Sequence, residues 1–168
     1  MRRRCGIAAI WLCGALFLFG CVVRGITGQE WVARKFEMMD EIQAFALNLD
    51  SIVTLYSINA IETEDYMNEL LIADQAYAYL RSTDTEERVR PGGQSEETIR
   101  AMQAYVKIWD DFGDLLEILH SQEAEDDRNY LVYQYMAYRD DILSNVLIFS
   151  ETYYSLFPDK AQAETREE

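Results

Sequence analysis

Apolar residues between positions 29 and 157 recur at the spacing of amphipathic helices. In four successive stretches they are separated by steps of three and four residues, the period of one helix face. The first two stretches contain Met38, Ile42, Phe45, Leu49, Ile52 and Tyr56, then Tyr66, Leu70, Ala73, Tyr77 and Leu80, flanked by Met67 and Leu71. The other two contain Ile99, Met102, Val106, Trp109, Phe112, Leu116 and Leu119, then Tyr135, Tyr138, Ile142, Val146, Phe149 and Tyr153. Each stripe must be buried against the others, so the pattern predicts an all-α domain, an antiparallel four-helix bundle.

The helix-breaking and helix-capping residues agree with this division. No Gly or Pro occurs from Gln29 to Arg90, which argues against a turn-rich β-architecture. The stretch 82–94 holds a Pro and two Gly residues, and Ser95 follows it as a predicted N-cap ahead of two glutamates. Pro158 comes directly after the fourth stripe, so we expect the last helix to end near that residue.

Two of the expected helix boundaries lack Gly and Pro. Helices one and two would part near Asn59 to Thr63, and helices three and four near His120 to Asp127, with Ser121 as a candidate cap. The first apolar register, however, continues through Asn59 and Thr63 to Tyr66. The alternative fold is therefore a hairpin of two very long helices, each of about 50 residues or more, that forms a homodimer. We prefer four helices, because unbroken helices of that length are uncommon outside coiled coils.

The amino terminus has the organisation of an export signal. A cationic start, Met1 to Arg4, precedes an uncharged, largely apolar run from Cys5 to Val23. The run contains Leu18-Phe19-Gly20-Cys21, which resembles the lipobox of bacterial lipoprotein precursors, although Phe19 occupies a place usually held by a small residue. The resemblance implies that Cys21 is lipidated, and it makes Val22 compatible with onward sorting to an outer membrane.

The same residues allow an uncleaved membrane anchor, because the 19-residue run nearly matches the roughly 20 residues that cross a bilayer. Either interpretation places the rest of the chain on the non-cytoplasmic side of a membrane. We accordingly expect a signal or anchor at 1–21, a tether at 22–28, a helical bundle at 29–157 and a polar tail at 158–168.

Composition narrows the chemistry of the exported part. All three Cys residues precede position 22, so this part has no thiol, disulfide or thiolate metal site. From Val22 onward the chain carries 12 basic and 30 acidic side chains, a formal charge of −18. This balance excludes nucleic acid as an expected partner and disfavours a domain lying along an anionic lipid surface, since both need clustered Lys and Arg.

Metal and catalytic sites have little support. Glu117 and His120 have the spacing of a diiron motif, but that architecture needs the motif twice and His120 is the only histidine. A carboxylate row on helix three could hold a hard cation, but we prefer a solvated helix face, because charges opposite an apolar stripe are ordinary for a surface helix. This row consists of Asp110, Asp111, Asp114 and Glu117. We expect no metal, no cofactor, no catalytic residue and no enzymatic activity.

Tyrosine is the most unusual component. The chain has 11 Tyr residues, and four of them lie between positions 130 and 138. At helical spacing they fall on more than one face, so some of them should lie at the surface. Tyrosine combines an apolar ring with a hydrogen-bonding tip, which suits a binding surface. We therefore name Tyr135, Tyr138 and Arg139 as the candidate partner or ligand surface.

These features predict a lipid-anchored protein of the bacterial cell envelope. Its acidic helical bundle would bind or brace another envelope protein, with the acyl chain on Cys21 bound in membrane lipid. The alternative is a periplasmic or surface bundle that binds a small molecule and acts with a separate membrane protein.

Overall fold

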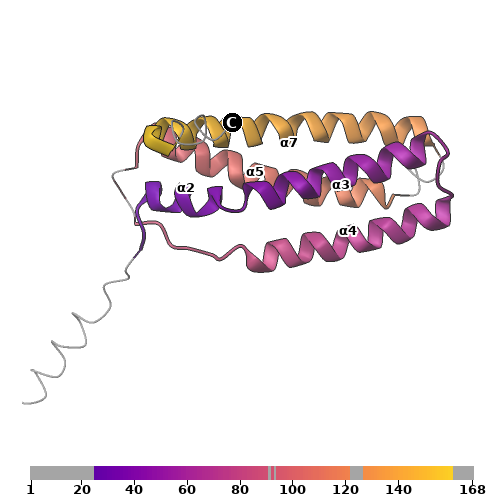
Figure 1. Ribbon diagram of the computed structural model, residues 1–168, viewed down its shortest axis with the longest axis horizontal. Helices are drawn as coiled ribbons and strands as arrows, with labels where there is room; N and C mark the ends of the chain where they lie inside the picture. Colours follow the sequence, from indigo (N-terminus) through magenta and orange to yellow (C-terminus); the bar gives the residue numbers. More distant parts are fainter. Residues whose placement is uncertain (1–24, 91, 93, 122–126, 161–168) are drawn as a thin grey trace, which may run out of the picture.

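The computed structural model describes residues 25–90, 92, 94–121 and 127–160, and this part of the chain is all-helical (Figure 1). The helices are α2 (Gly28–Phe36), α3 (Met39–Ser57), α4 (Thr63–Thr83), α5 (Glu96–Leu119) and α7 (Arg128–Leu156). Within the described ranges there is no strand; the nearest feature is one isolated parallel bridge between Ile26 and Val89. The all-α prediction is confirmed.

The helices run along one common long axis. α2 and α3 follow each other along one side, α5 and α7 form the most extensive helix pair, and α3 lies between α4 and α7 (Figure 1). α4 packs on α3, and the hydroxyls of Tyr66 and Tyr77 of α4 donate hydrogen bonds to backbone carbonyl oxygens of α5. The start of α2 and the end of α7 lie at the same end of the molecule (Figure 1). Phe36, the last residue of α2, stacks on Tyr153 of α7 with ring centroids 3.6 Å apart.

The predicted apolar stripes form most of the core. Those of α3 and α7 are buried or half-buried throughout. The prediction was wrong for the first half of α5, where Ile99 and Val106 are 42% and 53% exposed. Here α5 turns another face inward, because Tyr105 packs edge-on against Trp31 of α2 rather than toward α4. Leu71 of α4, expected to widen the second stripe, is also exposed.

Local capping explains most helix ends. The side chain of Ser95 accepts a hydrogen bond from the backbone N–H of Thr98, as the sequence predicted. α7 is capped by Asp127, whose carboxylate accepts from two backbone N–H groups, and not by Ser121. α7 ends at Leu156, two residues before Pro158. Of the expected polar tail, residues 161–168 lie outside the described residues.

The chain breaks between α3 and α4, so the alternative of one continuous long helix here was wrong. Asn59 has a φ of +58°, a left-handed conformation that ends a helix and that Asn adopts more readily than most residues. Another break, at Glu37 and Met38 between α2 and α3, was not predicted.

Four residues of the expected tether, 25–28, are described and contact the helical domain. Ile26 forms two backbone hydrogen bonds of 3.0 Å, one to Arg88 and one to Arg90. Thr27 and Glu30 form a reciprocal capping box, which starts α2 at Gly28. Residues 25–28 are thus attached to the helical domain. Cys21 and the predicted signal lie outside the described residues, and no helix within those residues is long and apolar enough to cross a membrane.

Candidate functional site

A groove of about 230 Å³ lies between α3 and α7 and has its floor on α5. We call it the α3–α7 groove. From α3 it is lined by Gln43, Ala46, Leu47, Leu49 and Asp50, from α5 by Phe112 and Leu115, and from α7 by Tyr135, Arg139, Ile142, Leu143 and Val146. These positions recur at three- and four-residue steps on α3 and α7, so each helix presents one continuous face to the groove.

The walls and rim of the groove are apolar. Phe112 and Leu115 form a floor and are each 1% exposed. Leu47 and Leu143 form opposite edges and are 71% and 45% exposed. The short side chain of Ala46 between them leaves the groove open.

One carboxylate organises the polar end of the groove. The hydroxyl of Tyr135 donates a hydrogen bond of 3.0 Å to Oδ1 of Asp50, and Nε of Arg139 lies 3.7 Å from the same oxygen. The Asp50 and Arg139 side chains are 44% and 43% exposed, so both reach solvent. Burial raises the pKa of the Tyr135 hydroxyl well above its usual value, and the Asp50 charge raises it further. Tyr135 therefore remains a neutral donor at physiological pH.

The structure brings together two of the three predicted surface residues. Tyr135 and Arg139 line the groove, whereas Tyr138 lies elsewhere on α7, half-buried against the core. Tyr135 is also less exposed than expected, at 5%, because its ring fills space between α3 and α7 and only its hydroxyl end meets Asp50. The strongly exposed tyrosines are Tyr133 and Tyr79.

Sequence reasoning missed Leu47, Leu143 and Asp50. A signal existed for the two leucines, since each lies outside the apolar register of its helix and so should face solvent. No local pattern singled out Asp50. It forms the polar end of the groove because it accepts a hydrogen bond from Tyr135, which lies 85 positions away in the chain.

The carboxylate row of α5 does not form one cluster. Asp111 is fully buried and pairs with Lys107, whose pKa is raised by that hydrogen bond, while Asp110, Asp114 and Glu117 face solvent. His120 pairs with Asp74 of α4 at 2.9 Å instead of Glu117. Across the described part of the chain, no three His, Cys, Asp or Glu residues are grouped so as to hold a metal ion.

A second polar cluster fastens the connection between α4 and α5. Lys35 is 4% exposed; its ammonium group pairs with Asp84 and donates a 2.7 Å hydrogen bond to the carbonyl oxygen of Thr85. The same group lies 5.6 Å and 5.9 Å from the ring centroids of Trp31 and Tyr105. Asp84 also lies 3.8 Å from Arg81, so this cluster ties the end of α4 to α2 and α5.

The α3–α7 groove can accept apolar groups along its length and a hydrogen-bonding or charged group at its polar end. The residues that line it include no Ser, Thr, Cys, His or Lys. No protein-family model, curated protein or solved structure matches the chain.

Proposed function

We propose that this chain is a lipid-anchored protein of the bacterial cell envelope whose helical domain binds an apolar segment of another envelope protein in the α3–α7 groove. The domain is then an antiparallel four-helix bundle in which α2 and α3 together form one broken helix. The observation that carries the proposal is the exposure of Leu47 and Leu143 on both edges of an apolar groove. Exposed apolar surface of this kind marks interaction sites.

The proposed location is supported by the export-signal organisation and by Cys21 in the lipobox-like segment. Anchorage restricts the protein to the membrane surface and raises its effective concentration toward partners there. A modest interface, such as one groove that receives a few side chains, would then suffice.

The groove dimensions favour a protein segment over a free metabolite. Its volume of about 230 Å³ is below the roughly 300–1,000 Å³ of typical small-molecule sites. A second candidate function, small-molecule sensing, is supported by the convergence of Gln43, Asp50, Tyr135 and Arg139 on the groove.

Site-specific photo-crosslinking in intact cells tests the proposal. A photo-reactive residue replaces Leu47 or Leu143 in the groove, and in the matched control it replaces Tyr79, which is 67% exposed on α4. We expect one defined heteromeric adduct from both groove positions and none from the control position.

Two outcomes would contradict this proposal. Adducts formed in equal yield from position 79 would show that the groove does not bind a partner selectively. Adducts formed only between two copies of this chain would show that the groove mediates self-association and does not bind another protein. If the groove positions form no protein adduct, native mass spectrometry of the purified protein tests the second candidate function by detecting a bound small molecule.

A further inference from the structure

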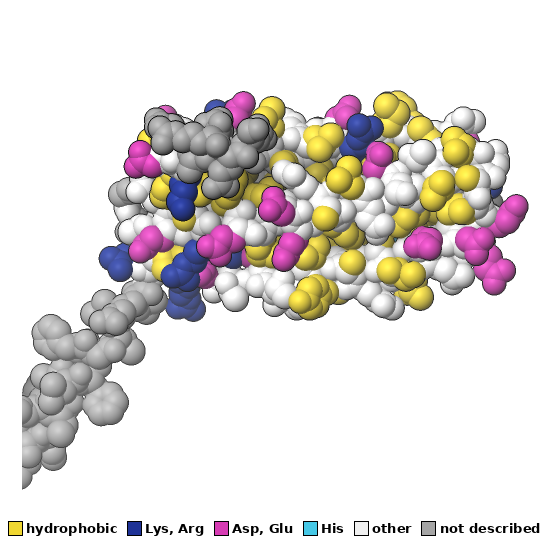
Figure 2. Space-filling model, viewed as in Figure 1, with side chains coloured by type: hydrophobic (Ala, Val, Ile, Leu, Met, Phe, Trp, Pro, Cys, Tyr) yellow, Lys and Arg dark blue, Asp and Glu magenta, His cyan; other side chains and the backbone are white. Residues whose placement is uncertain are grey.

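A line of exposed apolar residues on α7 extends the α3–α7 groove lengthwise. Met136, Leu143 and Leu147 are 49%, 45% and 58% exposed and follow one another at steps of seven and four positions. Residues at these steps lie on one face of a helix, and Leu143 places that face at the groove. We call these three residues the α7 stripe. Figure 2 shows yellow side chains spread over α7 and α3 on one face of the molecule.

The walls of the groove offer no backbone hydrogen bonds to a bound segment. All lining residues belong to α3, α5 and α7, whose backbone N–H and C=O groups are hydrogen-bonded within each helix. An extended segment would bury its own backbone groups here without partners, which is unfavourable. A helix satisfies its backbone internally and presents only side chains to the groove. The groove therefore suits a helix better than a strand.

The two helices that form the walls are acidic. α3 and α7 together carry six carboxylates and two arginines, a formal charge of −4. The guanidinium group of Arg128 lies 4.2 Å from the ring centroid of Tyr56, and Arg128 is not among the residues that line the groove. Arg139 faces Asp50. The floor, on α5, is apolar and adds no charge.

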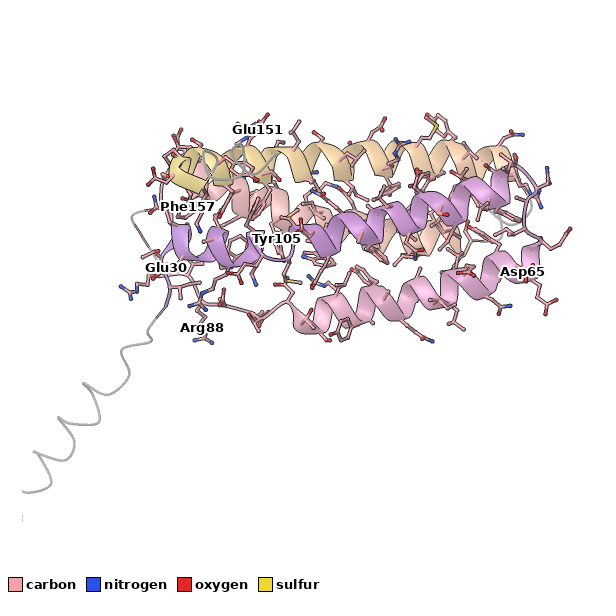
Figure 3. All side chains as sticks on the ribbon, in the orientation of Figure 1. Glu30, Asp65, Arg88, Tyr105, Glu151 and Phe157 are labelled. Carbon is pink, nitrogen blue, oxygen red and sulfur yellow. The ribbon has the colours of Figure 1, made fainter. Side chains whose placement is uncertain are left out.

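Three of these carboxylates border the groove and the α7 stripe. Asp50 lies at the polar end, Asp140 follows Arg139, and Glu151 lies four positions after Leu147. Figure 3 shows Glu151 on the outer side of α7, pointing away from the other helices. Among the described residues, neither Asp140 nor Glu151 takes part in an ion pair. A bound segment that covered Asp50 would remove water from its carboxylate, and a cation on that segment would offset this cost.

We propose that the segment bound in the α3–α7 groove is a basic amphipathic α-helix of the partner protein. Its apolar face packs on the α7 stripe, and its Lys or Arg residues pair with Asp50, Asp140 and Glu151. These contacts are shorter than the screening length of about 8 Å at physiological ionic strength, so salt weakens them without removing them. The inference rests on the proposed function, because it specifies the kind of segment that the groove receives.

Photo-crosslinking of the full-length chain in intact cells tests the helical part. A photo-reactive residue replaces Met136, Leu143 or Leu147, and mass spectrometry locates the cross-linked residue of the partner for each position. The three positions are separated by about 10 Å and about 6 Å along α7. On a helix lying along the groove, the partner residues should be displaced by about seven and four positions, but on an extended strand by about three and two. We expect the helical displacements, in a segment with more Lys and Arg than Asp and Glu.

Charge variants test the electrostatic part. Asp140→Asn/Glu151→Gln should lower the adduct yield from position 143 at least threefold. The control Glu69→Gln/Glu117→Gln removes the same charge from exposed residues of α4 and α5 and should leave the yield unchanged.

Strand-like displacements, a neutral or acidic partner segment, or equal yields from the two charge variants would overturn the inference while a heteromeric adduct still supported the proposed function. If no heteromeric adduct forms at any of the three positions, the proposed function fails and the inference fails with it. The two failures are thus distinguishable.

Discussion

The hydroxyl of Tyr135 lies 3.0 Å from Oδ1 of Asp50 and joins α7 to α3 at the polar end of the groove. The same carboxylate oxygen lies 3.7 Å from Nε of Arg139. Tyr135 thus holds Asp50 from the core side while Arg139 approaches it from solvent. This arrangement orients the polar groups that a bound segment would meet.

Replacing Tyr135 by Phe should destabilise the domain by about 1 kcal/mol, because the ring still fills its space but the hydrogen bond to Asp50 is lost. The Asp50 carboxylate is half-exposed, so water can replace the lost hydroxyl as its hydrogen-bond donor. The loss of stability is therefore small for a hydrogen bond to a charged group. Urea unfolding followed by circular dichroism measures it. Tyr133→Phe, at a side chain that is 73% exposed, should change stability by less than about 0.5 kcal/mol. Equal losses in both variants would show that the Asp50 contact contributes nothing.

Leu47→Ser should leave the stability of the domain nearly unchanged, since Leu47 is 71% exposed. Leu49→Ala, only two positions away, should cost about 3 kcal/mol because Leu49 is 1% exposed in the core. Thermal and urea unfolding of both variants provides the comparison. A large loss in Leu47→Ser would mean that this residue supports the fold and is not available to a partner.

Lys35→Met should destabilise the domain by about 3 kcal/mol, because it leaves the carboxylate of Asp84 without its buried ammonium partner. The double variant Lys35→Met/Asp84→Leu should recover most of the loss, since neither charge then remains. Arg34→Met is the matched control: its side chain is 57% exposed, and its ion pair with Glu87 should contribute less than about 1 kcal/mol. If the double variant is as unstable as the single one, the loss does not come from an unpaired charge.

Gly113 and Tyr77 should be energetically coupled. The Tyr77 hydroxyl donates a 3.2 Å hydrogen bond to the carbonyl oxygen of Trp109, and a Cβ at position 113 would lie 3.2 Å from that hydroxyl. Gly113→Ala gains about 1 kcal/mol of helix propensity but crowds Tyr77. In a double-mutant cycle, Gly113→Ala should therefore stabilise a Tyr77→Phe background more than the natural chain. Additive effects would show that no crowding occurs.

Alkaline pH should unfold the domain through its buried tyrosines. Burial is the main cause that raises the pKa of Tyr66, Tyr105 and Tyr135 above the ordinary value of 10. The folded state then holds these protons more tightly than the unfolded state, so stability present below pH 10 is lost as the pH rises above it. Absorbance at 295 nm and circular dichroism should change together above pH 10. If all tyrosines ionised while the circular dichroism of the helices stayed unchanged, Tyr66, Tyr105 and Tyr135 would not be buried as described.

Helix boundaries were predictable where a local signal exists. Ser95 forms the N-cap its sequence context indicated, and Asn59 to Thr63 separates two helices. The capping box of Thr27 and Glu30 also had a readable Thr-x-x-Glu pattern. By contrast, no Gly, Pro or capping residue marks the break at Glu37 and Met38, and apolar residues continue at helical spacing on both sides of it.

The sequence by itself determined the all-α class and the buried stripes of α3 and α7, because helix formation and amphipathic spacing depend on residues three and four positions apart. Only the tertiary structure decided that α5 turns Tyr105 inward and leaves Val106 exposed, since the choice of buried face depends on α2 and α4. The groove and the pairing of Tyr135 with Asp50 were decided in the same way. They arise from the space left between helices that are remote in sequence, which no local pattern encodes.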